Sequence, residues 1–218
     1  MKKCAWVSRI AAVLCVLGLG GVAAAGDKWE ERDKGGGATI FSKDKAGSDV
    51  DVIKGVIQLP YTTAEVARIL TSNDPRDTFI PDMKHFKILK EEKLPTGRLV
   101  QFIHQISAVP VISDREVIVR AETWSEPGDK GDTWHSTFKA TLQNAPPPNA
   151  DIVRIVQLEG AWVLKPTGDG KGSVFTYTAH AEVGGNVPDF MAESGQIDNL
   201  LQMLKNLRAL CVKHHGAR

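Results

Sequence analysis

Between Phe86 and Val183 the chain is a succession of strand-like segments separated by short turns. Turn sequences such as Pro95-Thr96-Gly97 and Gly168-Asp169-Gly170 separate segments rich in β-branched and aromatic residues. Short connections predict antiparallel pairing, and a sheet of about eight or nine strands should curl because its twist accumulates. The strands expected in this region are Phe86 to Glu91, Arg98 to Ser107, Glu116 to Thr123, Thr133 to Leu142, Ile152 to Glu159, Trp162 to Lys165 and Ser173 to Val183.

A long amphipathic helix follows the last strand. Gly184-Gly185 permits a sharp change of direction, and Pro188 suits the first helical turn. A glycine inside the helix, Gly195, indicates either close packing against the sheet or a bend, and we expect close packing. The apolar stripe comprises Ile197, Leu200, Leu201, Leu204, Leu207 and Cys211, widened by Met203 and Leu210. A curled sheet is the surface that remains to bury this stripe, which predicts an α+β fold.

The part of the chain before Phe86 supplies one hairpin and one helix. Alternation from Ala38 to Leu59 predicts two strands, and Trp29 to Lys34 is expected to form one or two helical turns before a flexible triple glycine. Thr62 followed by Glu65 predicts a capped helix that ends before Asn73. The loop from Asn73 to Phe86 is open to two interpretations, ordinary packing or a mobile gate.

Residues 1–25 are expected to be a signal peptide. Lys2 and Lys3 precede an apolar run that ends in Ala23-Ala24-Ala25, and the run is short for a membrane span, which is the competing interpretation. Cleavage leaves Cys211 as the one thiol and residues 26–218 as one domain. The expected location is the periplasm or the exterior of the cell.

Charge excludes a nucleic-acid partner. The chain has 27 basic and 26 acidic residues, and removal of Lys2, Lys3 and Arg9 leaves 24 basic residues. The remaining basic residues are scattered between acidic ones, as on a solvated surface. The sequence therefore predicts no basic stripe for phosphate backbones.

The titratable residues give little support to an enzyme. No histidine has the spacing of a zinc motif, so neither a metal nor a cofactor is expected. His180 and Glu182 share a strand face and are conceivable as an acid–base pair, although a solvent-facing pair is the preferred interpretation. Cys211 lies on the apolar stripe and is interpreted as a small hydrophobic residue.

Four segments in order resemble the steroidogenic-acute-regulatory-related lipid-transfer (START) domain family. They are VPVISDREVIVR from Val109 to Arg120, LEGAWVLKP from Leu158 to Pro166, SVFTYTAHAEVGGNVP from Ser173 to Pro188, and the final helix. The resemblance extends from about Trp29 to Lys213. It implies a helix-grip (START/Bet v 1-like) fold, in which a curled sheet wraps the C-terminal helix around a tunnel that holds one lipid.

The resemblance also implies what the protein does. Family members bind sterols, phospholipids or similar lipids and move them between membranes without covalent chemistry. The expected partners are a lipid ligand and, transiently, a membrane surface, with the protein acting as a monomer. The alternative is a helix-grip enzyme of the polyketide cyclase or hydrolase type. Arg120 lies five positions after Arg115 and so on the opposite strand face, a departure from the family that leaves open whether either arginine touches a ligand.

Strand alternation together with the resemblance gives a set of expected ligand-lining residues. Small inward residues such as Ala121, Ala179 and Gly160 are expected to leave space that a solid core does not contain. The lining is predicted to comprise Val117, Val119, Ala121, Phe138, Leu158, Trp162, Tyr177, Phe190, Ile197, Leu201 and Leu204.

Overall fold

The computed structural model describes residues 28–108, 112–185, 187 and 189–218, without the side chains of Pro75 and of residues 189–192. The expected signal peptide, residues 1–25, lies outside this range. In the described part of the chain the strands are β1 (Glu30–Gly35), β2 (Ala38–Lys43), β3 (Val52–Leu59), β4 (Met83–Lys93), β5 (Leu99–Ser107), β6 (Arg115–Glu126), β7 (Thr133–Ala140), β8 (Val153–Arg154), β9 (Gln157–Pro166) and β10 (Ser173–Glu182). The helices are α1 (Thr63–Leu70), a 3-10 turn η1 (Pro75–Asp77) and α2 (Asp189–His215).

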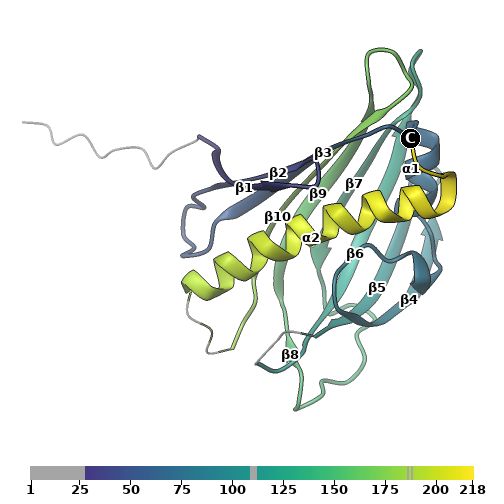
Figure 1. The fold of residues 1–218 in the computed structure, drawn as a ribbon. Helices are drawn as coiled ribbons and strands as arrows, with labels where there is room; N and C mark the ends of the chain where they lie inside the picture. Colours follow the sequence, from purple (N-terminus) through teal and green to yellow (C-terminus); the bar gives the residue numbers. More distant parts are fainter. Residues whose placement is uncertain (1–27, 109–111, 186, 188) are drawn as a thin grey trace, which may run out of the picture.

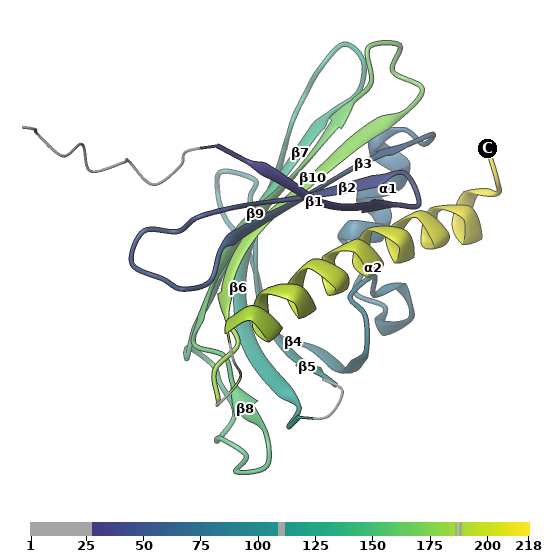
Figure 2. The ribbon, with the colours of Figure 1, turned by 60° about the vertical axis from the view of Figure 1, so that its left-hand side comes forward.

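The strands form one strongly curved sheet that wraps around α2 (Figures 1 and 2). Its order is β1-β2-β3-β10-β9-β7-β6-β5-β4, and β8 pairs with β6. All pairs on the main path are antiparallel. The predicted α+β helix-grip fold, a curled antiparallel sheet around a long C-terminal helix, is confirmed.

Helix α1 begins as its sequence predicts. The Glu65 backbone N–H donates to Thr62 Oγ1 at 3.4 Å, and the Thr62 N–H donates to Glu65 Oε2 at 2.9 Å, which completes the capping box. The buried side of α1 includes Val66, Ala67 and Ile69. None of the helices in the described ranges is long and apolar enough to cross a bilayer.

The segment expected to be helical at Trp29 to Lys34 is instead strand β1. Gly36 and Gly37 have φ of 58° and 80°, the positive values that a type I′ hairpin turn requires at both central positions. The turn folds β1 back onto β2, with Gly35 opposite Ala38. A helix of one or two turns is marginal in water, so the hairpin is the more stable structure.

The two strands expected at Ile152 to Glu159 and at Trp162 to Lys165 are also divided differently. Val153 and Arg154 form the short strand β8, which pairs parallel to β6. Strand β9 then runs without interruption through Gly160. Gly160 does not interrupt the strand, because the aromatic ring of Phe138 occupies the position that a side chain at Gly160 would take.

Candidate functional site

Helix α2 is seated closely on strand β3. A Cβ atom built on Gly55 would lie 2.8 Å from Leu204 Cδ1 and 3.1 Å from Leu200 Cγ, so a side chain at this position has no room. The nearest neighbours of α2 are β1, β2, β3 and α1. We call the sheet face that carries Gly55 the inner face, and the opposite face the outer face.

The first apolar cluster on the inner face joins α2 to its seat, and we call it the helix cluster. Four of the predicted lining residues, Trp162, Ile197, Leu201 and Leu204, lie in it, and each is at most 8 % exposed. Their neighbours there are Ala38, Ile40, Ile53, Ile57, Leu59, Tyr61, Val66, Ala67, Ile69, Leu164, Phe175, Leu200, Met203, Leu207 and Cys211. This side of the molecule is a packed core.

A second apolar cluster covers the inner face further along the sheet, and we call it the β6 cluster. Its centre is Val117, Val119 and Ala121, which are 9 %, 6 % and 9 % exposed. The register places Val119 opposite Ile103 of β5 and Ala140 of β7. The partly buried members are Ile103, Phe138, Ala140, Ile155 and Leu158. Apolar side chains therefore line the inner face where α2 is not closely seated.

On β5 the inner-face side chains are more exposed than the outer-face side chains, which is the reverse of the pattern in a solid core. The outer-face residues Val100, Phe102 and His104 are buried, with exposures of 3 %, 5 % and 9 %. Their inner-face neighbours Gln101, Ile103 and Gln105 are only half-buried. A filled interior would bury the inner residues more completely than the outer ones. The inner side chains of β5 are therefore less completely covered by their neighbours than the outer ones.

Phe138 links the two clusters. Its ring stacks on Tyr177 with centroids 5.3 Å apart and an interplanar angle of 24°. A Cβ on Gly160 would lie 2.4 Å from Phe138 Cζ, so the space expected above Gly160 is filled by this ring, which corrects that prediction. Burial raises the pKa of the Tyr177 phenol above its ordinary value. The Tyr177 hydroxyl has no hydrogen-bond partner in the described part of the chain.

The two arginines of β6 lie on opposite faces, as predicted. On the inner face, buried Arg115 donates from Nε to the Val183 carbonyl at 2.9 Å and from Nη2 to the Gly184 carbonyl at 3.0 Å. Burial lowers the pKa of its guanidinium. On the outer face, Arg120 donates to Glu122 at 3.2 Å. Arg115 therefore ties β6 to the turn that leads into α2.

His180, the histidine considered above for catalysis, lies on the outer face, and so does His104. His180 is buried, and its Nε2 lies 3.1 Å from Ser48 Oγ, which also donates to Glu182 at 3.3 Å. The expectation of a solvent-facing pair is therefore wrong for His180, because the segment between β2 and β3 lies against this face of β10. His104 Nε2 lies 3.0 Å from the buried carboxylate of Glu116.

Glu116 is held from two sides. Besides His104, Arg154 of β8 donates to it at 2.9 Å, and Arg154 also donates to the Pro146 carbonyl at 3.0 Å. This network attaches the segment after β7 to the outer face. Among the described residues there is no group of three or more His, Cys, Asp or Glu side chains placed to hold a metal ion.

Two hollows border the sheet, and the one of them that reaches the β6 cluster does so only at Phe138. One, of about 540 Å³, is lined mainly by outer-face residues such as Arg120, Lys139 and Glu159, and it also reaches Phe138, Gly160 and Ala179. The other, of about 720 Å³, lies beside the C-terminal part of α2.

Three residues of the β6 cluster, Ile103, Ala140 and Ile155, are not among the predicted lining residues. Alternation along β5 places Ile103 opposite Val119 and would have identified it. Ile155 could not be found in this way, because Ile152 to Glu159 was expected to be one regular strand, in which Ile155 and Leu158 fall on opposite faces. The side chain of Phe190 lies outside the described part of the structure. The structure also overturns the close packing expected at Gly195, since a Cβ there would meet nothing within 4 Å.

Comparison with known proteins gives the same family. A family model for the START domain matches residues 22–215. An uncharacterized protein of Pseudomonas aeruginosa is 27 % identical over 201 residues, which covers 91 % of this chain and 93 % of the relative.

Solved structures share the fold at low sequence identity. The STAR-related lipid transfer protein of Xanthomonas axonopodis has a TM-score of 0.71 and 22 % identity, covering 85 % of this chain and 99 % of that one. Human StAR-related lipid transfer protein 5 has a TM-score of 0.72 and 16 % identity, covering 88 % and 89 %. Because the family model spans nearly the whole described structure, and the curled sheet and final helix are those of the matching structures, the chain belongs to the START domain family.

Proposed function

We propose that the protein binds one lipid between the β6 cluster and α2 and transfers it between membranes without covalent chemistry. The observation that carries this proposal is the exposure pattern of β5, whose inner side chains are less buried than its outer ones. The family and the lipid-transfer proteins among the matching structures support lipid binding in general.

Binding would rest on burial of apolar surface. A sterol-sized ligand that hides about 300 Å² of apolar surface gains about 7 kcal/mol before the entropic cost of association. Val117, Val119, Ala121 and Leu158 offer such surface. The hydroxyl of Tyr177 and the side-chain amide of Gln105 would be polar partners for one end of the lipid, whereas the amide of Gln101 already donates to Asn73 and Glu91.

Transient contact with a membrane is part of the proposal. Of the four large apolar side chains exposed among the described residues, three are Ile112, Leu142 and Val156, with exposures of 39 %, 64 % and 60 %, and the fourth is Val212 of α2. The first three belong to the segments between β5 and β6, between β7 and β8, and between β8 and β9. The described parts of these segments lie at the end of the sheet near β8 (Figures 1 and 2). Entry of the lipid would therefore occur at this end.

We also propose that the protein acts as a monomer outside the cytoplasm after removal of residues 1–25.

Mass spectrometry of the delipidated protein mixed with a bacterial lipid extract tests the binding step. One bound lipid per chain is expected, and repeated recovery of the protein without lipid would count against the proposal. Fluorescent-lipid transfer between vesicles tests the second step.

A pair of substitutions distinguishes a hollow from a filled core. Val119→Trp places an indole on the inner face, and Val163→Trp places one on the outer face of β9 as the matched control. If the interior is hollow, Val119→Trp abolishes lipid binding and leaves the fold intact. If it is filled, overpacking destabilises the protein by about 1–3 kcal/mol or more. The control should retain both lipid binding and stability.

A further inference from the structure

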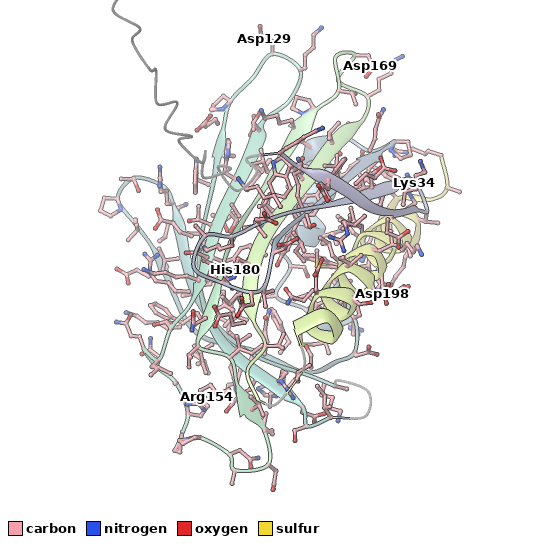
Figure 3. All side chains as sticks on the ribbon, turned by 90° about the vertical axis from the view of Figure 1, so that its left-hand side faces the viewer. Lys34, Asp129, Arg154, Asp169, His180 and Asp198 are labelled. Carbon is pink, nitrogen blue, oxygen red and sulfur yellow. The ribbon has the colours of Figure 1, made fainter. Side chains whose placement is uncertain are left out.

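The hollow of about 720 Å³ lies at the end of the molecule opposite β8, away from the β6 cluster, and one member of the helix cluster, Leu59, borders it. It is bordered by the turn between β1 and β2, the end of β3, the β9–β10 hairpin and the C-terminal part of the chain. Figure 3 shows Asp169 at the tip of this hairpin and Arg154, in β8, at the far end. The lining residues are Gly37, Gln58, Leu59, Pro60, Thr167, Asp169, Lys171, Gly172, Arg208 and Arg218.

Two of the charges around this hollow already have opposite charges or donors beside them. Asp169 accepts from the Thr167 hydroxyl at 2.6 Å and from the Lys171 backbone N–H at 3.1 Å, and these bonds hold the pKa of its carboxyl below the ordinary value. Arg218 donates to Glu65 at 2.8 Å and 3.1 Å. The Arg218 charge is therefore matched within the protein.

Arg208 is different. Its Nη2 donates to the Gln58 carbonyl at 2.9 Å, while its buried Nε has no acceptor in the described part of the chain. No carboxylate of the described residues forms an ion pair with it. A guanidinium N–H without an acceptor is costly to bury, because its hydration is lost without replacement.

The turn at Gly37 fixes the place of this guanidinium. A Cβ at Gly37 would lie 2.6 Å from Arg208 Nη2, and the φ of 80° there also favours glycine. The glycine thus leaves room for the guanidinium at the wall of the hollow. Lys171 adds a second cation to the lining, and the exposed Pro60 supplies apolar surface.

We propose that this hollow binds a phosphate group, with Arg208 as its principal partner and Lys171 as a second cation. Guanidinium and phosphate match in charge and in planar, two-donor geometry. Pro60 would contact the organic part that carries the phosphate. Such a group can belong to a soluble phosphorylated molecule or to the headgroup of a phospholipid in a membrane. The site is separate from the β6 cluster, so the proposal does not depend on lipid binding there.

Nuclear magnetic resonance of the purified protein tests the proposal with inorganic phosphate and glycerol 3-phosphate, at constant ionic strength. Saturable shifts are expected at the Gly37 and Gly172 amides and at the Arg208 side-chain Nε–H. Arg208→Gln should weaken binding about tenfold or more, since a hydrogen bond to a charged group is lost. Lys171→Glu should also weaken phosphate binding, and it should not affect folding because Lys171 lies on the exposed hairpin. This variant therefore still tests the proposal if Arg208→Gln does not fold.

Lys130→Glu is the matched control. Lys130 lies on the neighbouring hairpin, whose residue Asp129 is seen beside Asp169 in Figure 3. Lys130 does not line the hollow. A second arm compares cosedimentation with phosphatidylcholine vesicles and with vesicles that also contain phosphatidylglycerol. Loss of vesicle binding in Arg208→Gln identifies a headgroup, whereas phosphate binding without vesicle binding identifies a soluble ligand. The absence of saturable binding in both arms, or an equal loss in Lys130→Glu, overturns the proposal. Lipid recovery at the β6 cluster should be unchanged in all three variants.

Discussion

Replacement of Gly55 by alanine measures how closely α2 is held on the sheet. The new methyl group would lie 2.8 Å from Leu204 Cδ1 and 3.1 Å from Leu200 Cγ, below the 3.4–4 Å of ordinary contacts. Both leucines are buried, with exposures of 0 % and 2 %, so neither can move into solvent without loss of packing. We expect Gly55→Ala to lower the free energy of unfolding by about 1–3 kcal/mol, the usual cost of overpacking.

A double-mutant cycle isolates the contact. Leu204→Ala alone should cost about 2–5 kcal/mol, because it leaves a cavity under the helix. In the double variant, the methyl group at position 55 occupies part of that cavity. The combined loss should therefore be smaller than the sum of the single losses by about 1 kcal/mol. Urea denaturation followed by tryptophan fluorescence measures the four unfolding free energies, with Trp162 of the helix cluster as a core reporter.

Gly195→Ala is the matched control, since the same methyl group there meets nothing within 4 Å. In the middle of a helix this change should stabilise the protein by up to about 1 kcal/mol. The reasoning is refuted if Gly55→Ala is as stable as the unaltered protein, or if the losses in the cycle simply add. Either result would mean that α2 is seated less closely than the distances indicate.

Three further predictions concern the periphery of the fold. Thr62→Ala removes the side-chain acceptor of the α1 capping box and should cost about 1 kcal/mol in unfolding free energy, measurable by thermal denaturation. Hydrogen bonds from Arg218 lower the pKa of Glu65 from 4.5 to about 2. Because this carboxyl has a lower pKa in the folded state, its stabilising contribution is complete above pH 4.5 and is lost as the pH falls toward 2. Arg218→Gln should therefore flatten the acid limb of the stability curve, and an unchanged acid limb would contradict the assignment. Burial raises the pKa of the Cys211 thiol to about 11, so iodoacetamide at pH 8 should label it slowly in the native protein and rapidly in urea; rapid native labelling would show that this side of α2 opens.

Local chemistry made much of the fold predictable from the sequence. The capping box at Thr62 and Glu65 needs only residues three positions apart, and the exit from β10 through Gly184 needs only backbone freedom. Alternation along β6 also placed Val117, Val119 and Ala121 on one face, and the structure groups them in one cluster. These features depend on neighbours in sequence, which is why reading the sequence was sufficient.

Features that depend on neighbours in space were not predictable in the same way. Gly160 continues a strand because the ring of Phe138 lies over it from β7. His180 is buried because Ser48 reaches it from a segment 132 positions away. β1 is a strand because a turn of two glycines returns it to β2. In each case the deciding partner lies on another element of the fold.

The separation between the helix cluster and the β6 cluster has a consequence for how such proteins can diversify. Leu204 and its neighbours anchor the terminal helix, whereas Val117, Val119 and Ala121 contribute little to that anchorage. A change in side-chain size at Val117, Val119 or Ala121 alters the shape of the interior without weakening the anchorage of α2. Under the proposed function, descendants of one scaffold would therefore acquire new ligands through a few exchanges on β6, with little thermodynamic penalty to folding.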